Sequence, residues 1–167
     1  QGVKYVISVA TIWSNAKGID DFSRIRKILH KDIKIVLVGL SENMIIELPD
    51  GIIGIPRTQS QLELAQLYSG AEALVSLSGS ETFGLTIAEA LACGTPAIVY
   101  NNSAQPELVD EYTGKVVPNK DFHQAALAIK DFIDKGFKQQ HSQECRNRAS
   151  ELFDKNKSYR SYIQLYS

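Results

Sequence analysis

The sequence is poor in the features that mark several large protein classes. Only two cysteines occur among 167 residues, Cys93 and Cys145, which are too few for a disulfide framework or a cysteine metal cluster. This usage is typical of a reducing compartment. No apolar run reaches the roughly 18 to 20 residues of a membrane-spanning helix. The net charge of −1 gives no indication of a nucleic-acid-binding surface.

Histidine is also scarce, which limits the chemistry that the chain can perform. We expect His30, His123 and His141 at the surface, since they lie at a helix end or in the late helical region. Neither a histidine base nor a metal site is therefore predicted. A serine nucleophile is not indicated either, because neither Ser78 nor Ser80 has an adjacent base in the sequence.

The sequence does contain an alternation of short apolar runs with helical patterns. With 44% hydrophobic residues and a length that suits one domain, the chain can bury a substantial core. Six strands are predicted, at about residues 4–10, 33–38, 52–55, 73–77, 97–100 and 115–117. Helices are predicted after residue 18, around 64–71, at 84–92, at 105–109 and from 121 onward. This order predicts an α/β fold, a doubly wound parallel sheet of six strands with helices on both faces.

Ligands of such sheets bind beyond the carboxyl ends of the strands. Lys17 follows the first predicted strand, Arg57 the third, residues 81–85 the fourth and residues 101–107 the fifth. The candidate ligand-binding residues are therefore expected at one edge of the sheet. Each is weak evidence alone, because a single lysine is usually a solvated surface residue and Arg57 either faces the cleft or is simply exposed.

The most informative stretch runs from Ser80 to Pro96, SETFGLTIAEALACGTP. It places Glu81 in a glycine-containing loop and Glu89 in an almost wholly apolar helix. We expect Glu89 to be buried and to need a hydrogen-bonding partner. A ligand rich in hydroxyls over the start of this helix would satisfy both carboxylates. Gly84 stands at the start of this helix. It either lets an anion approach the backbone N–H groups there or only makes a tight turn, and the residue alone does not decide between the two.

These motifs resemble the family-4 retaining glycosyltransferases of the GT-B fold. The shared pattern is a glutamate, seven residues, a second glutamate and a Gly-Thr-Pro turn at 94–96. Further similarity lies in Lys17-Gly18-Ile19-Asp20, in residues 63–68, in residues 105–109 and in residues 114–117. Such enzymes have two Rossmann-like domains. The resemblance implies that residues 1–167 form a single C-terminal, donor-binding domain and that the N-terminal acceptor domain is absent from this chain.

The resemblance also implies roles for three charged residues. Glu81 would accept hydrogen bonds from the donor sugar, and Glu89 would take the two ribose hydroxyls. Lys17 would neutralise the diphosphate and stabilise the leaving group as charge develops on it. Glu81 and Lys17 are thus the predicted catalytic residues.

The remaining predicted site residues surround the diphosphate. Backbone N–H groups of Phe83, Gly84 and Leu85 would meet the sugar and the diphosphate. The family usually has an arginine six positions before the lysine, where this sequence has Thr11. The phosphate site would then hold one cation fewer, unless Arg57 supplies it.

A complete enzyme of this kind would move a sugar from a UDP- or GDP-linked donor to a glycan or lipid-linked acceptor, with retention at the anomeric carbon. The family needs no metal and no further cofactor. The resemblance implies bacterial polysaccharide or lipid-linked glycan assembly in the cytoplasm or at the inner face of the membrane, with peripheral membrane association left open. No nucleic acid is expected as a partner. The isolated chain is expected to bind donor without transferring sugar.

Two alternatives keep the fold and change the function. One is a GT-B-type sugar-nucleotide epimerase, which the lack of a cleft histidine disfavours. The other is a non-catalytic sugar-nucleotide-binding module, which the retained pair Glu81 and Glu89 disfavours. A nicotinamide-dependent oxidoreductase is poorly supported, because no Gly-x-Gly-x-x-Gly follows the first predicted strand.

Overall fold

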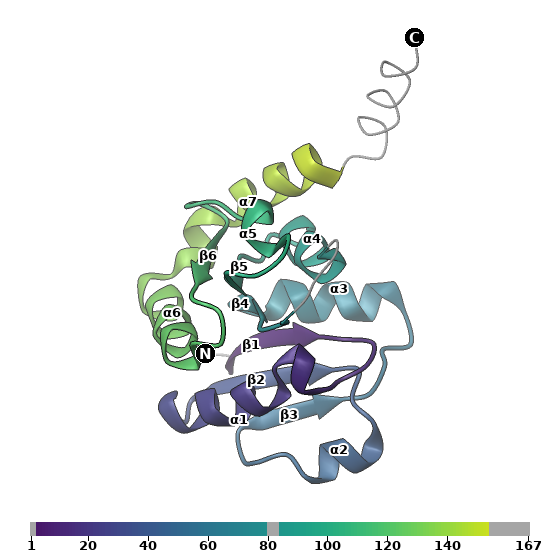
Figure 1. The fold of residues 1–167 in the computed structure, drawn as a ribbon. Helices are drawn as coiled ribbons and strands as arrows, with labels where there is room; N and C mark the ends of the chain where they lie inside the picture. The colour runs from purple at the N-terminus through teal and green to yellow at the C-terminus, as the bar shows by residue number, and fades with distance from the viewer. Residues whose placement is uncertain (1–2, 80–83, 154–167) are drawn as a thin grey trace.

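A computed structural model describes residues 3–79 and 84–153 of the chain (Figure 1). Within these residues a six-stranded sheet has the order β3-β2-β1-β4-β5-β6, and all its neighbouring strands are parallel. The strands are β1 (Lys4–Val9), β2 (Ile33–Val38), β3 (Ile52–Ile55), β4 (Ala73–Ser76), β5 (Ala97–Tyr100) and β6 (Gly114–Val117). The predicted doubly wound, Rossmann-like fold is confirmed.

A helix lies between every two consecutive strands, and the helices between β2 and β3 and between β5 and β6 are short. The helices are α1 (Ile19–Ile28), α2 (Glu42–Ile46), α3 (Gln61–Gly70), α4 (Leu85–Ala92), α5 (Gln105–Leu108), α6 (Phe122–Lys135) and α7 (Phe137–Phe153). A 3₁₀ turn at Asn15–Lys17 precedes α1. The sequence patterns predicted neither this turn nor α2, which the hydroxyl of Ser41 caps by accepting from the Met44 N–H.

Two hydrophobic cores lie on the two faces of the sheet. One joins the sheet to α1 and α6 and contains Phe22, Ile25 and Ile129. The other joins it to α3, α4 and α7 and contains Tyr68 and Ile87. Because both faces are covered, β5 is apolar along its whole length, and β2 is apolar except for Lys34 near its start.

The strand order reverses direction between β1 and β4, which lie side by side in the middle of the sheet. The chain winds outward from β1 through β2 to β3, and from β4 through β5 to β6 (Figure 1). The loops that follow β1 and β4 therefore diverge to opposite faces and leave a crevice at their carboxyl ends. This crevice is where the predicted site residues converge.

Candidate functional site

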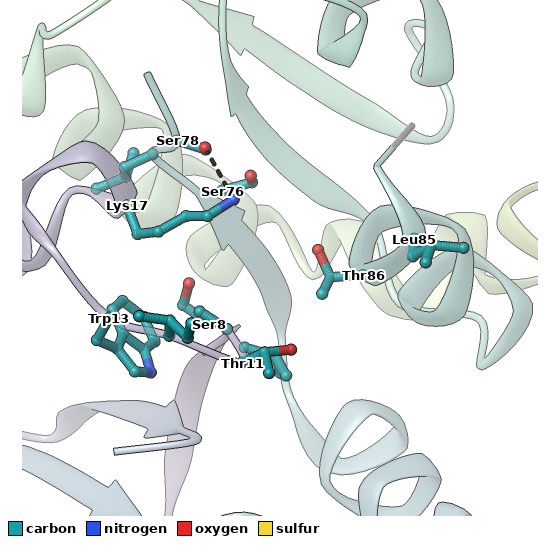
Figure 2. A pocket seen from close by; sticks show the side chains of 12 residues that line it. Ser8, Thr11, Trp13, Lys17, Ser76, Ser78, Leu85 and Thr86 are labelled. Carbon is teal, nitrogen blue, oxygen red and sulfur yellow. Dashed lines mark hydrogen bonds between the residues drawn. The ribbon is translucent and has the colours of Figure 1, made fainter. Parts of the chain in front are cut away.

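A cavity of about 350 Å³ lies at the carboxyl ends of β1 and β4 (Figure 2). The strands contribute the hydroxyls of Ser8 and Ser76, and the segment after β4 contributes that of Ser78. All three serines are buried. Lys17 reaches in from the segment after β1 with its amino group beside Ser76 and Ser78, and Thr86 lies across the cavity in the first turn of α4 (Figure 2). The cavity thus combines several hydroxyls and one ammonium group with an apolar wall that includes Trp13 and Leu77.

The position of Lys17 is set by a close approach between two loops. Its Nζ donates to the Oγ of Ser78 at 3.3 Å. The next residue, Gly18, has a φ of +76° and lies against Leu77, where an added Cβ would come within 2.6 Å of the leucine Cβ. Only glycine allows this contact without displacing the loop. The Lys-Gly pair therefore keeps the ammonium group against the end of β4.

A second cavity of about 540 Å³ adjoins the first and shares five lining residues with it, namely Val9, Ala10, Thr11, Leu85 and Thr86. It extends past the end of β2 to the loop after β3 and the start of α3. Glu89 and Arg57 both line it. The two cavities form one continuous cleft along the carboxyl edge of the sheet, from Lys17 to Arg57.

Glu89 is exposed, so the expectation of a buried carboxylate is wrong. The helix α4 turns Ile87, Ala90 and Leu91 into the core and leaves Glu89 on its outer face, where it borders the second cavity. Apolar neighbours along the chain do not surround a helical side chain, since adjacent residues point in different directions. The Glu89 carboxylate accepts a hydrogen bond from the Tyr68 hydroxyl, at 2.9 Å between oxygens.

Tyr68 is a site residue to which the sequence analysis assigned no role. Its ring is 1% exposed, between α3 and the sheet. Burial, followed by the negative charge of Glu89, raises the pKa of the Tyr68 hydroxyl well above its usual range. The hydroxyl therefore stays protonated and acts as a donor. The available signal was a tyrosine on the apolar face of a predicted helix, because a buried tyrosine usually finds a partner for its hydroxyl.

Gly84 caps the N-terminus of α4 with a φ of +71° and without a side-chain hydrogen bond to the first turn. A Cβ at this position would lie 2.3 Å from Cδ1 of Leu108. The following residue, Leu85, is 62% exposed at the mouth of both cavities. Gly84 thus makes a tight turn at the start of α4, and its contact with a diphosphate stays a prediction. Glu81 and Phe83 lie outside the described residues, and their roles stay predictions.

Gln105 anchors the loop that leads towards residues 80–83. This side chain is fully buried at the start of α5. Its Oε1 accepts from the Ser76 hydroxyl at 2.6 Å, and its Nε2 donates to the Ser78 carbonyl at 3.0 Å. The sequence predicted a short helix here but no role for the amide, which ties the end of β4 to the β5–α5 connection.

Thr11 and Arg57 are both exposed, and both line the second cavity. The sequence left open whether Arg57 faces the cleft or is simply exposed. In the structure it is exposed and also lines the cavity that Glu89 lines. Its contact with a phosphate remains a prediction.

The described residues contain no group of three or more histidine, cysteine, aspartate or glutamate side chains that could hold a metal. His141 is only partly exposed and packs against the ring of Phe137, with centroids 4.5 Å apart, contrary to the expectation of a surface residue. It lies at a kink in α7, far along the chain from the cleft residues. No helix in the described part of the chain is long and apolar enough to cross a membrane.

A family model described as "Glycosyl transferases group 1" matches residues 1–152. The chain belongs to this family. A curated relative, the GDP-mannose-dependent alpha-(1-6)-phosphatidylinositol dimannoside mannosyltransferase of Mycobacterium tuberculosis, is 32% identical over 90 residues, which are 54% of this chain and 23% of the relative. The match therefore covers about a quarter of that relative's length.

Solved structures share the fold over nearly the whole chain. Sucrose-phosphate synthase from Thermosynechococcus elongatus superposes with a TM-score of 0.83 and 27% identity, over 98% of this chain and 45% of that chain. The Anabaena protein HepE, solved in complex with UDP, gives a TM-score of 0.84 at 18% identity, over 98% of this chain and 49% of that chain. At 18% identity the second likeness shows the fold alone.

Proposed function

We propose that this glycosyl transferases group 1 chain is the donor-binding, C-terminal domain of a family-4 retaining glycosyltransferase. It binds a nucleoside-diphosphate sugar and, together with an N-terminal domain outside residues 1–167, transfers the sugar to a glycan or lipid-linked acceptor. The observation that carries this proposal is the continuous cleft with Glu89 in one cavity and Lys17 in the other, joined at the N-terminus of α4.

The cleft offers a suitable place for each part of such a donor. The larger cavity takes the nucleoside, with the ribose diol at the Glu89 carboxylate. The diphosphate lies over the shared residues of the two cavities, where the N-terminus of α4 supplies backbone N–H groups and a partial positive charge. The smaller cavity, with the hydroxyls of Ser8, Ser76 and Ser78, takes the sugar.

The chemical step breaks the bond between the anomeric carbon and the diphosphate, so negative charge develops on the departing phosphate oxygen. Lys17 and the α4 terminus stabilise this charge in the transition state. Thr11 contributes a hydroxyl where the family usually has an arginine, and Arg57 approaches the same cavity from the loop after β3. We infer that Arg57 supplies part of the missing positive charge.

Two comparisons support a nucleoside-diphosphate donor. The Anabaena neighbour was solved with UDP, and the name of the mycobacterial relative includes GDP-mannose, so a nucleoside diphosphate is common to both. The epimerase alternative needs acid–base groups in the cleft, and among the described residues neither cavity is lined by a histidine. The proposal includes assembly of a bacterial polysaccharide or lipid-linked glycan at the inner face of the membrane.

A thermal-shift measurement with UDP and with GDP tests the proposal. A ligand that binds only the folded state raises the melting temperature, so we expect at least one of the two nucleotides to stabilise the chain. Glu89→Ala should abolish this stabilisation, because it removes the acceptor of the ribose hydroxyls. The matched control is Glu151→Ala, an exposed glutamate on α7 that lines neither cavity. An undiminished shift in Glu89→Ala would exclude the ribose role.

A further inference from the structure

We propose that Tyr68 is a positioning residue that presets the Glu89 carboxylate to receive both hydroxyls of a ribose. This inference rests on the proposed function and adds a residue that does not itself touch the nucleotide. Tyr68 comes from α3 and Glu89 from α4, so the site is assembled by the packing of two helices against each other.

An exposed glutamate on a helix ordinarily samples several rotamers, and fixing one of them on ligand binding costs conformational entropy. In this protein the Tyr68 hydroxyl donates to Glu89 Oε2 at 2.9 Å. The carboxylate is therefore held against the wall of the larger cavity. Part of the ordering cost is met during folding, which is the general benefit of preorganisation.

Tyr68 can hold the carboxylate because Tyr68 is itself held firmly. Its ring is 1% exposed, and its carbonyl accepts a hydrogen bond from Oγ1 of Thr95 at 2.7 Å. Thr95 is fully buried. The Gly94-Thr95-Pro96 turn that follows α4 thus fixes the end of α3, and through Tyr68 it acts on the side chain of Glu89.

The hydrogen-bonding capacity of the carboxylate fits a diol. Its two oxygens can accept about four hydrogen bonds in total, and Tyr68 uses one of them. Enough capacity remains for the 2′- and 3′-hydroxyls of one ribose. A 2′-deoxyribose offers only the 3′-hydroxyl, so it gains less from a carboxylate whose orientation is preset.

The test is titration calorimetry of the 167-residue chain with UDP and with GDP, each beside its 2′-deoxy counterpart. For Tyr68→Phe we expect affinity for the ribonucleotide to fall about tenfold, the size of effect typical of a hydrogen bond to a charged group. Affinity for the deoxynucleotide should change by less than about twofold. The ratio of the two affinities is the decisive readout, because a general loss of structure would lower both.

Two further variants complete the experiment. Tyr5→Phe is the matched control, since the Tyr5 hydroxyl donates at 2.7 Å to the carbonyl of Leu67 on the same helix but lies outside both cavities. It should leave both affinities unchanged. Adding Tyr68→Phe to Glu89→Gln should cause no further loss, because the two residues act through one interaction.

The other outcomes contradict the role of Tyr68, and they show whether the proposed function fails as well. If Glu89→Gln weakens binding and Tyr68→Phe leaves the affinity ratio unchanged, Tyr68 is only a core residue and the proposed function stands. The same conclusion holds if Tyr68→Phe weakens both nucleotides equally. If the unmodified chain binds neither nucleotide, or binds them independently of Glu89, the proposed function fails and the positioning role fails with it.

Discussion

Gly84 caps the N-terminus of α4 in a backbone conformation that other residues adopt at a cost, and the two residues that follow it, Leu85 and Thr86, line both cavities. Its φ is +71°, and an added Cβ would contact Leu108 at 2.3 Å. Gly84→Ala should lower the free energy of unfolding by about 1–2 kcal/mol, the cost of a left-handed conformation for a residue with a side chain. The same change should weaken nucleotide binding, because relaxation of the turn displaces the first N–H groups of α4.

Urea unfolding measures this cost, and Gly79→Ala is its control. Gly79 has no positive φ, and the nearest atom to its added Cβ, the carbonyl oxygen of Ala16, is 3.5 Å away. We expect that variant to change the free energy of unfolding by well under 1 kcal/mol. Similar losses in the two variants would contradict the argument from backbone conformation.

At the residue scale, the sequence predicted which residues line the candidate site, but it did not predict the exposure or the hydrogen-bond partner of Glu89. Glu89, Lys17 and Arg57 do line one cleft, because each follows a strand whose carboxyl end faces it. The prediction that Glu89 is buried is wrong, because residues that are neighbours in the sequence of a helix point in different directions. Its partner Tyr68 lies 21 positions earlier, and no local pattern indicates which residue on α4 its hydroxyl meets.

At the scale of the helix, the N-caps of α3 and α6 allow stability and binding to be separated. The Ser60 hydroxyl accepts from the Glu63 N–H at 3.1 Å, and the Asp121 carboxylate accepts from the Gln124 N–H at 3.0 Å. Replacing either cap with alanine should cost about 1 kcal/mol of stability, because an N–H of the first turn loses its partner.

Only Ser60→Ala should also weaken nucleotide binding, since the start of α3 lines the larger cavity whereas α6 packs on the opposite face of the sheet. Chemical unfolding and calorimetric titration of both variants check the two effects separately. Equal losses of affinity in Ser60→Ala and Asp121→Ala would mean that binding follows overall stability and not the local order of α3.

The elements themselves differ in how well the sequence predicts them. Strands β2, β3 and β5 have the predicted limits, because each is a short, mainly apolar run next to glycine, proline or polar residues that end a strand. The helix α2 was missed. It has only five residues, and Ile46 is 82% exposed, so its sequence lacks the one-sided apolar pattern by which helices are found.

At the scale of the whole molecule, parallel topology makes the location of the site predictable. Strands that alternate with helices must place all their carboxyl ends at one edge, and the two directions of winding leave a crevice there. What topology does not determine is how closely α3, α4 and the loops approach one another. Those distances depend on side-chain packing between segments far apart in sequence, such as Gly18 against Leu77.

The last prediction concerns the 167-residue chain as a unit. Its cleft runs along an open edge of the sheet, with Ile12 and Leu85 exposed at 76% and 62% beside the cavities. Transfer needs a bound acceptor and exclusion of water from the anomeric carbon, and we expect neither from one wall of a cleft. This chain should therefore bind UDP or GDP but, when incubated with UDP-glucose or GDP-mannose and a glycan acceptor, should release no more nucleotide than buffer alone. Chromatographic detection of a glycosylated product made by this chain alone would show that residues 1–167 contain the complete catalytic site, and would refute the assignment of acceptor binding to another domain.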